Sequence, residues 1–376
     1  MRLRILFIIC IFFGVLPSAG QTGRMFTTDK ELSNSNIRCI FQDHEGIVWI
    51  GTENGLNYYD GAEFRVLKHK DNDKSTLTDN DVRAVFEDDK GHFLVGTLRG
   101  LQQYDRETGL FKGVTILGND GNPVNAHITK IIQRKNGEVL VSTSGYGVFS
   151  INWRKGNAYS KKKDYSLINS FVINIFEDKE CNLWISMDGG GLTCLRKRGK
   201  NSTYFSATNN AWNTVTSIVQ DHAGKIFIGT MDNGLMTYNP LSDSFVTVKT
   251  NYPNYPINLL YSLNDHEFCI GTNGKGLFRF NTDYKLLQEE AIPFLAFDFS
   301  ICDVNSILKD RIGNLWLGIK GKGILLLPSS SNRFNYWGYK SYSNNLIGSS
   351  SVTAINKGHN GIIWIGTSNN GLYGVN

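Results

Sequence analysis

The sequence predicts an all-β fold, a β-propeller built from four-stranded antiparallel blades. Three observations lead to this prediction. A phrase of about ten residues recurs eight times, at intervals of 42 to 48 residues, which is the period of a propeller blade. Short apolar segments alternate with turn residues inside every copy. The composition adds 39 Gly and 12% aromatic residues but 7 Pro, which is typical of many short strands and tight turns.

The eight copies align on the Gly-Thr pair of the phrase VWIGTENGL, residues 48–56. The aligned position is occupied by Gly51, Gly96, Ser142, Ser186, Gly229, Gly271, Gly318 and Gly366. A parallel β-helix needs about half this period, and a helical solenoid needs a 3.6-residue hydrophobic periodicity that the copies lack. The spacing therefore favours a propeller over a solenoid.

Each copy predicts the same four strands in order. A β-rich segment ends at an Asp-x-x-Gly turn, such as residues 43–46, and a second apolar segment ends in Gly-Thr. A glycine turn follows, for example Asn54-Gly55, because a tight hairpin needs a residue that accepts positive φ. A third strand ends near Tyr-Asp or Tyr-Asn. A weaker fourth strand is expected over residues such as 64–68 or 245–248.

Two slots of the repeat predict structural roles. One slot contains Trp49, Trp184, Trp316 and Trp364, but Leu, Phe or Cys fills it in other copies, as expected for a packing position between blades. The other starts the Asp-x-x-Gly turn, where a carboxylate can accept backbone N–H bonds, and contains Asp43, Asp88, Asp178, Asp221 and Asp310. Because other residues fill this slot in the remaining copies, for example Arg134 and Gly358, no metal site is predicted.

The first twenty residues predict a secretory signal peptide. Arg2 and Arg4 precede an apolar run over 5–16, and small residues follow at 18–20. The run is shorter than the ~20 residues that span a membrane, so cleavage near residue 20 is expected. Removing the leader lowers the formal net charge from +5 to +3, which does not indicate a nucleic-acid partner. The five remaining cysteines are widely spaced and indicate neither a disulfide framework nor a zinc site.

The pattern D-x-x-G-x-x-W-I-G-T-x-x-G-L-x-x-Y-D, as in residues 43–60, resembles the two-component regulator propeller repeat. Residues 26–64 are similar to the start of the sensor region in hybrid two-component systems of Bacteroidetes type. The resemblance implies a periplasmic sensor with two consecutive seven-bladed propellers, a β-sandwich, a membrane helix and a histidine kinase, which detects glycan fragments. This sequence contains the repeats but no kinase motif and no membrane span after the leader, so it is expected to be a fragment of a longer sensor, a truncated gene product or a stand-alone propeller.

Two ways of closing the ring are compatible with the sequence. Residues 24–28 are predicted to be an unpaired fourth strand, which would complete either repeat seven or repeat eight. The family pattern favours seven blades, whereas the end of repeat eight directly after its third strand favours eight. We favour a propeller over 21–340, with 341–376 starting a second propeller or closing the ring as an eighth blade. A strand near 334–339 would also belong to the second unit.

Candidate ligand residues are expected in the variable loops between repeats, because loops on a rigid scaffold suit recognition. Aromatic rings suit stacking on sugar faces, and neighbouring basic residues suit an acidic glycan or a partner. The candidates are Tyr165, Trp212, Tyr252, Tyr255, Trp337, Arg154, Lys197 and Arg198. Arg154 is expected to lie near Lys197 and Arg198, because they follow the third strands of adjacent blades. Packing of the loops and a solvated rim are the alternative roles.

The function predicted from these observations is ligand recognition in signal transduction, with an oligosaccharide as ligand and no cofactor. Further sensor domains or a second copy of the chain are the other expected partners. The sequence has no GxSxG, HExxH or P-loop motif, and His44, His222 and His359 occupy one turn slot in separate blades, so catalysis is not predicted. A structural or protein-interaction propeller, the remnant of a broken sensor gene, is the alternative, and a propeller hydrolase or lyase has the least support.

Overall fold

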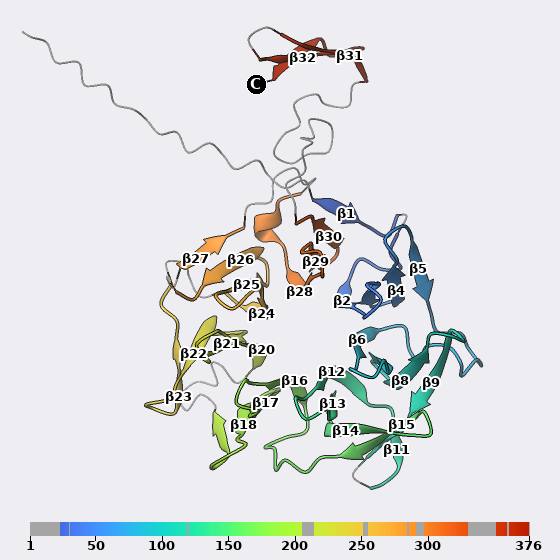
Figure 1. Cartoon of the computed structure of the whole chain (residues 1–376), viewed down its shortest axis with the longest axis vertical. Coiled ribbons are helices and arrows are strands. Elements are labelled where there is room, and N and C mark those ends of the chain that lie inside the picture. Colours follow the sequence, from blue (N-terminus) through green and yellow to red (C-terminus); the bar gives the residue numbers. More distant parts are fainter. Residues whose placement is uncertain are drawn as a thin grey trace, which may run out of the picture.

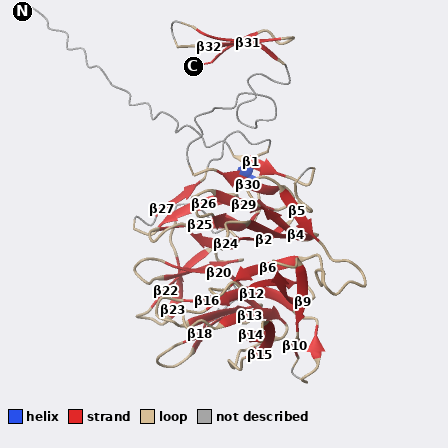
Figure 2. Ribbon diagram, turned by 45° about the vertical axis from the view of Figure 1, so that its right-hand side comes forward, coloured by secondary structure: helices blue, strands red, loops and turns tan. Residues whose placement is uncertain are grey.

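The computed structural model describes residues 23–29, 31–118, 120–204, 214–250, 255–283, 286–290, 297–329, 351–358 and 361–375. Strands and loops make up nearly all of this part of the chain, and one short 3-10 turn, η1 (Phe299–Ile301), precedes the seventh blade (Figure 2). The all-β propeller prediction is confirmed. No helix among the described residues is both long and apolar enough to cross a membrane.

The first three repeats each form a four-stranded antiparallel sheet. Blade 1 contains β2 (Ile37–Gln42), β3 (Val48–Thr52), β4 (Gly55–Tyr59) and β5 (Phe64–Leu67). Blade 2 contains β6 (Val82–Glu87), β7 (Phe93–Thr97), β8 (Gly100–Asp105) and β9 (Leu110–Val114). A small hairpin, β10 (Ile116–Leu117) with β11 (Pro123–Val124), follows it. Blade 3 contains β12 (His127–Gln133), β13 (Val139–Ser144), β14 (Gly147–Arg154) and β15 (Asn157–Lys162).

The next three repeats have the same topology. Blade 4 contains β16 (Val172–Glu177), β17 (Leu183–Met187), β18 (Gly191–Leu195) and β19 (Ser202–Tyr204). Blade 5 contains β20 (Val215–Gln220), β21 (Ile226–Thr230), β22 (Leu235–Asn239) and β23 (Ser244–Thr247). Blade 6 contains β24 (Ile257–Ser262), β25 (Glu267–Thr272), β26 (Leu277–Asn281) and β27 (Leu286–Glu289).

Blade 7 is assembled from both ends of the ring. Its inner strands are β28 (Val304–Lys309), β29 (Leu315–Ile319) and β30 (Gly323–Leu327), and the N-terminal strand β1 (Arg24–Phe26) pairs antiparallel with β30. The first strands of the blades neighbour one another in order around the centre, and β28 contacts β2 again (Figure 1). Of the two closures compatible with the sequence, the structure contains the one on repeat seven. The strand expected near 334–339 lies outside the described residues.

The eighth repeat forms a three-stranded sheet of its own, β31 (Val352–Lys357), β32 (Ile363–Thr367) and β33 (Leu372–Val375). Most of its large apolar side chains are exposed where the matching ones in the ring are buried, although Ile365 is 2% exposed. Trp364 is 40% exposed, compared with 2% for Trp184 and Trp316. A Cβ at Gly366 would have its nearest neighbour at 3.5 Å, whereas one at Gly51 would lie 2.5 Å from the Val82 carbonyl oxygen of the next blade. The glycine of the phrase therefore permits close packing between blades.

The threonine of the phrase closes the hairpin that follows it. The Thr52 hydroxyl donates to the Gly55 carbonyl at 2.9 Å, and the Thr230 hydroxyl donates to Gly234 at 2.9 Å. This local bond forms in several blades. Blade packing and hairpin closure therefore explain why Gly-Thr recurs, and no catalytic or ligand-binding role is needed to explain it.

A hydrogen bond that we call the inter-blade latch joins neighbouring blades. The backbone N–H of the second turn residue, which follows Asp in most blades and Arg134 in blade 3, donates to a Gln or Glu side chain at the end of the next blade's first strand. His44 donates to Glu87 at 2.9 Å in this way, and Lys179 donates to Gln220 at 2.6 Å. The other latches join Asp89 to Gln133, Lys135 to Glu177 and Arg311 to Gln42. Blade 6 has Ser262 in this position, and there the His222 N–H donates to the Asp265 carbonyl at 2.9 Å.

Candidate functional site

The mouth of the central channel is lined by one residue from each of the seven first strands. A cavity of ≈ 450 Å³ opens on the face that carries the Gly-Thr hairpins, and it is also bordered by His127, Ser144, Phe171 and Asp188. The seven strand residues occupy the second position of the repeat. They are Arg38, Arg83, Thr129, Ile173, Thr216, Asn258 and Asn305.

A β-bulge explains why this position faces the channel in every blade. The pairing of first and second strands shifts register between Ile37 and Cys39 in blade 1, and at the same place in the other six blades. The residue inside the shift has no partner on the second strand, and a bulge redirects such a side chain. The bulge therefore turns seven equivalent side chains toward one opening.

The two arginines of the mouth are neutralised by carboxylates. Arg38 forms ion pairs with Glu53 at 2.7 Å and with Asp81 at 3.2 Å, and Arg83 pairs with Asp81 at 2.7 Å. The Arg83 Nε atom is buried without a hydrogen-bond partner among the described residues. The pairing leaves little net charge at the mouth, while Arg83 retains an unused donor.

His127 adds a neutral imidazole to the mouth. Burial lowers the pKa of His127, and the nearby Arg83 lowers it further, while Asp81 acts in the opposite direction. The ring is therefore uncharged at neutral pH and offers one donor and one acceptor.

The polar residues of blades 5 to 7 are held in place by bonds between blades. The Thr216 hydroxyl donates to the Ile257 carbonyl at 2.7 Å, and the Asn258 amide donates to Asn305 Oδ1 at 3.0 Å. In contrast to these polar residues, Phe171 contributes an apolar ring that is 53% exposed. Its backbone carbonyl accepts the backbone N–H of Asp188 at 2.8 Å. The mouth thus combines an exposed aromatic ring with prearranged polar groups.

Of the five aromatic residues proposed from the sequence, two lie in the part of the chain that the structure describes. Tyr165 is half-buried and packs against the core between blades 3 and 4, and burial raises its pKa to about 12. Tyr255 is half-buried and stacks on Phe278 with a centroid distance of 5.8 Å. Trp212, Tyr252 and Trp337 lie outside the described residues. Neither Tyr165 nor Tyr255 borders the cavity at the mouth.

Of the basic residues proposed from the sequence, two lie together. Lys197 and Arg198 border a hollow of ≈ 390 Å³ with Glu180, Asn182 and Arg196, beside the Asp-x-x-Gly turn of blade 4. Arg154 is exposed and does not border this hollow. The Arg196 guanidinium is itself engaged by Asp243 at 3.1 Å, and it donates to the Tyr204 hydroxyl at 2.8 Å.

The turn aspartates and tryptophans of the repeat form pairs within a blade. The Trp49 indole N–H donates to Asp43 Oδ2 at 2.6 Å, and Asp43 Oδ1 accepts the Ile47 backbone N–H at 2.9 Å. The same indole bond joins Trp184 to Asp178 and Trp316 to Asp310, both at 2.9 Å. The other two turn aspartates, Asp88 and Asp221, are also buried and accept backbone N–H bonds. These bonds connect the turn to the packing between blades.

Sequence reasoning missed the bulge residues. The signal was present, because the second position contains Arg, Thr or Asn in seven of the eight aligned repeats and always follows Ile or Val. A single strand shows no reason for that polar residue to face inward. Only the ring brings the seven positions to one opening.

Comparisons with known proteins agree with this architecture. Residues 31–54 match the family model described as "Two component regulator propeller". The chain carries a two component regulator propeller repeat. A 55-residue stretch is 34% identical to "Histidine kinase P4" of Formosa agariphila and covers 15% of this chain and 4% of that protein.

Solved structures similar to the chain include two extracellular domains from B. thetaiotaomicron. One, described as part of a hybrid two component system, has a TM-score of 0.69 and 21% identity, over 95% of this chain and 53% of that one. The other, described as part of a one component system, has a TM-score of 0.66 and 18% identity, over 88% and 46%. The chain with the two component regulator propeller repeat thus spans about half the length of these domains.

Virginiamycin B lyase of Staphylococcus aureus is also similar. Its TM-score is 0.62 with 13% identity, over 81% of this chain and 98% of the lyase. At these identities the structural similarity concerns the propeller fold alone.

Proposed function

We propose that this chain is the ligand-recognition propeller of an extracytoplasmic two component sensor, and that it binds a neutral oligosaccharide at the mouth of the central channel. The observation that carries the proposal is the ring of seven bulge residues around the ≈ 450 Å³ cavity. That volume falls within the about 300–1,000 Å³ of small-molecule sites.

The chemistry of the mouth fits a sugar better than a charged ligand. The exposed ring of Phe171 offers a flat apolar face, while Arg83, His127 and Asp188 offer hydrogen bonds to hydroxyl groups. Because Arg38 and Arg83 are already paired with Glu53 and Asp81, an acidic ligand would gain little from them.

The sensor role and the location outside the cytoplasm are supported by the repeat and by the similar extracellular domains. The predicted signal peptide, residues 1–20, lies outside the described residues, and periplasmic export is part of the proposal. The kinase partner would belong to other domains of such a sensor.

We propose that the site at the channel mouth binds its ligand without catalysing a reaction. Asp188 is the one carboxylate among the described residues that border the cavity, whereas glycoside hydrolysis by acid–base chemistry uses two carboxyl groups. The streptogramin lyase activity of a structural neighbour belongs to that protein and does not enter the proposal.

We also propose that residues 341–376 begin a second unit. The exposure of Trp364 supports this proposal, because the matching tryptophans of the ring pack between blades. The pairing of β1 with β30 also supports it, because β1 already covers the outer edge of blade 7. Further blades would bury the faces of β31–β33.

Binding of neutral oligosaccharides by calorimetry tests the proposal. We expect a panel of neutral plant, algal and microbial oligosaccharides to contain a ligand, and Phe171→Ala to weaken its binding at least tenfold. Tyr159→Ala is the matched control, since Tyr159 is an equally exposed aromatic residue on the outermost strand of blade 3. Equal binding by the wild type and Phe171→Ala would exclude the channel mouth. Absence of binding across the panel would favour the structural or protein-interaction role.

A further inference from the structure

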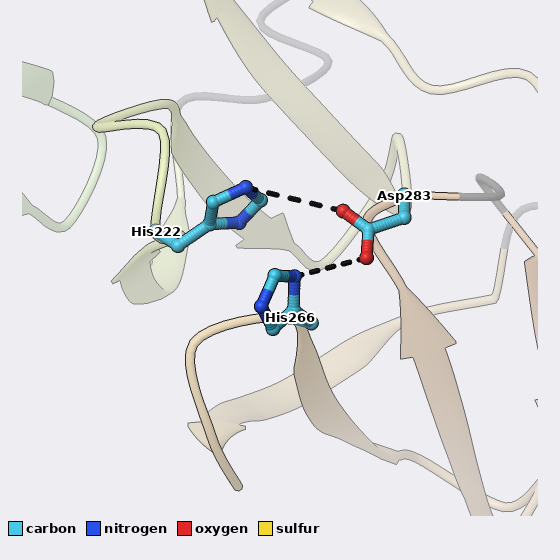
Figure 3. Close-up of side chains that lie close together, drawn as sticks. All are labelled: His222, His266 and Asp283. Carbon is cyan, nitrogen blue, oxygen red and sulfur yellow. Dashed lines mark ion pairs between the residues drawn. The ribbon is translucent and has the colours of Figure 1, made fainter.

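Three side chains from three different turns meet on the face opposite the channel mouth. His222 lies in the turn between β20 and β21 of blade 5. His266 lies between β24 and β25 of blade 6, and Asp283 lies between β26 and β27 (Figure 3). We propose that His222, His266 and Asp283 bind a divalent transition-metal ion, with zinc the best fit, that bridges blades 5 and 6.

The distances suit one ion. His266 Nδ1 lies 2.9 Å from Asp283 Oδ2, and His222 Nε2 lies 4.0 Å from Asp283 Oδ1. One candidate ligand atom from each residue lies within 4.8 Å of the others. Two ligands 2.0–2.1 Å from a tetrahedral zinc ion are roughly 3.4 Å apart, so small rotations of exposed side chains complete the geometry.

The hydrogen bonding of His222 leaves the correct nitrogen free. His222 Nδ1 lies 3.1 Å from the Asp265 carbonyl oxygen. A carbonyl only accepts, so Nδ1 carries the hydrogen, and in the neutral ring Nε2 keeps its lone pair. That lone pair points toward the Asp283 carboxylate, and two acceptors attract each other only through a proton or a cation between them (Figure 3). A backbone carbonyl that orients the other ring nitrogen is the usual support of a metal-binding histidine.

The three turns are fixed relative to one another. The Thr282 backbone N–H and hydroxyl both donate to the His266 carbonyl, at 2.8 and 2.9 Å. The Asp283 backbone N–H donates to Asn281 Oδ1 at 2.9 Å. The His222 backbone N–H donates to Asp265 at 2.9 Å. The backbone therefore positions all three ligands before any ion arrives.

The cluster lies where the inter-blade latch is altered. Blade 6 has Ser262 in place of the Gln or Glu that receives the latch in blades 1 to 5, so the turn of blade 5 reaches the turn of blade 6 instead. The two imidazole rings are in contact, with centroids 4.2 Å apart and ring planes tilted by 39°. A metal ion at this position would supply the connection between blades that the missing side chain does not.

The ligand set selects the class of metal. Two imidazoles and one carboxylate suit Zn²⁺, Ni²⁺ or Cu²⁺, whereas Ca²⁺ and Mg²⁺ prefer sets made of oxygen. All three residues are exposed, so solvent water completes the coordination. No sequence spacing links the three residues: His222 and His266 occupy different positions of the first-to-second-strand turn in blades 5 and 6, and Asp283 lies in the turn between the third and fourth strands of blade 6.

Calorimetric titration with ZnCl₂ alone, on the tag-free mature chain at neutral pH, tests the proposal. We expect one zinc ion per chain, with at least tenfold weaker binding in His222→Gln, His266→Gln and Asp283→Asn. His44→Gln is the matched control, since His44 occupies the same turn slot in blade 1, and its zinc affinity should equal that of the wild type.

A second readout separates binding from folding. Zinc should raise the Tm of the wild type and of His44→Gln, but not the Tm of His222→Gln. CaCl₂ at the same concentration should leave the Tm unchanged. Absence of zinc binding, or zinc affinity that is unchanged in both histidine variants, would overturn the proposal. Comparing the metal-free Tm values identifies a variant that fails to fold, and the remaining two ligand variants then decide the outcome.

Discussion

The backbone N–H of Arg311 donates a hydrogen bond of 2.9 Å to the side-chain oxygen of Gln42, although the two residues are 269 positions apart in the chain. The Arg311 guanidinium adds bonds of 2.7 Å to the His44 carbonyl and 2.6 Å to the Asp43 carbonyl. This contact joins blade 7 to blade 1 and supplements the pairing of β1 with β30. The ring is therefore closed at its rim and on the face that carries the Asp-x-x-Gly turns.

Replacing Arg311 by Ala should destabilise the ring. The change removes two charge-assisted bonds across the closure, and such bonds contribute about 1.5–3 kcal/mol each when buried and less at a partly exposed site. We expect a loss of about 1–3 kcal/mol in the free energy of unfolding, measured in urea. Arg154→Ala, an exposed arginine at the end of β14, is the control and should stay within about 0.5 kcal/mol of the wild type. Equal effects of the two variants would contradict the closing role of Arg311.

Tryptophan in the repeat slot should matter inside the ring and not in the eighth repeat. Trp184 packs near Tyr238 and Phe245 of the next blade, and its indole is bonded to Asp178. Trp184→Ala should cost about 3–5 kcal/mol, as large buried residues do. Trp364→Ala should change the unfolding of the ring by less than about 0.5 kcal/mol, because Trp364 is 40% exposed and belongs to the separate sheet of the eighth repeat. Urea denaturation monitored by circular dichroism compares them, and similar costs would refute the distinction.

Cys181→Gly should stabilise the protein. Cys181 occupies the glycine position of the Asp-x-x-Gly turn in blade 4 with φ = 65°, whereas Gly46 and Gly224 adopt φ of 93° and 83° in the same position. A residue with a Cβ loses roughly 1–2 kcal/mol in this region, and the greater freedom of glycine in the unfolded chain offsets about half of that. We expect a gain of about 1 kcal/mol in thermal or urea unfolding. Cys181→Ala, which removes the thiol and keeps the Cβ, should give no gain, and a gain there would mean that the thiol is the cause.

The stability of the fold should fall on mild acidification through His127. Its pKa is lowered by burial and then by Arg83, so the folded state binds the proton less readily than the unfolded state, whose value is near 6.5. The free energy of unfolding is then constant above pH 6.5 and decreases as pH falls toward the lowered pKa. His127→Gln should reduce that decrease, measured by urea denaturation between pH 7.5 and about 5. Thr129→Val, on the same strand without a titrating group, should keep the wild-type pH dependence, and an unchanged slope in His127→Gln would contradict the assignment.

The fold was predictable from the sequence because the propeller signal is repeated and local. Strands, hairpin turns and the Asp-x-x-Gly turns all follow from patterns shorter than twenty residues. The fourth strand expected over 64–68 is observed as Phe64–Leu67, and that over 245–248 as Ser244–Thr247. The N-terminal strand expected over 24–28 is Arg24–Phe26. Its partner was not predictable, since nothing in a three-residue strand specifies whether it pairs with repeat seven or repeat eight.

The candidate site was less predictable because it depends on closure of the ring. A bulge at Arg38 has no visible signature in one repeat. Its role in lining the cavity can be recognised only when the closed ring brings Arg83 and Asn305 to the same opening. The variable loops were expected to carry recognition, yet the cavity at the mouth is bordered mainly by strand residues. Likewise, His222 contacts His266 at the one junction where the accepting blade has Ser262 in place of the latch Gln or Glu. This contact involves two repeats, so the sequence of either repeat alone does not predict it.

The latches run in one direction around the ring: in most of them the turn of one blade donates to the strand of the next, and Arg311 returns the contact to Gln42. A head-to-tail contact of this kind builds a closed ring when the rotation per unit completes a circle and an open filament when it does not. Blades 1 to 5 thus both donate and accept such a bond, whereas between blades 6 and 7 the Lys309 backbone N–H of blade 7 donates to the Tyr261 hydroxyl of blade 6. Excising one repeat would leave a wedge-shaped gap with one unmatched donor surface and one unmatched acceptor surface, which two copies of the shortened chain could satisfy by exchanging blades.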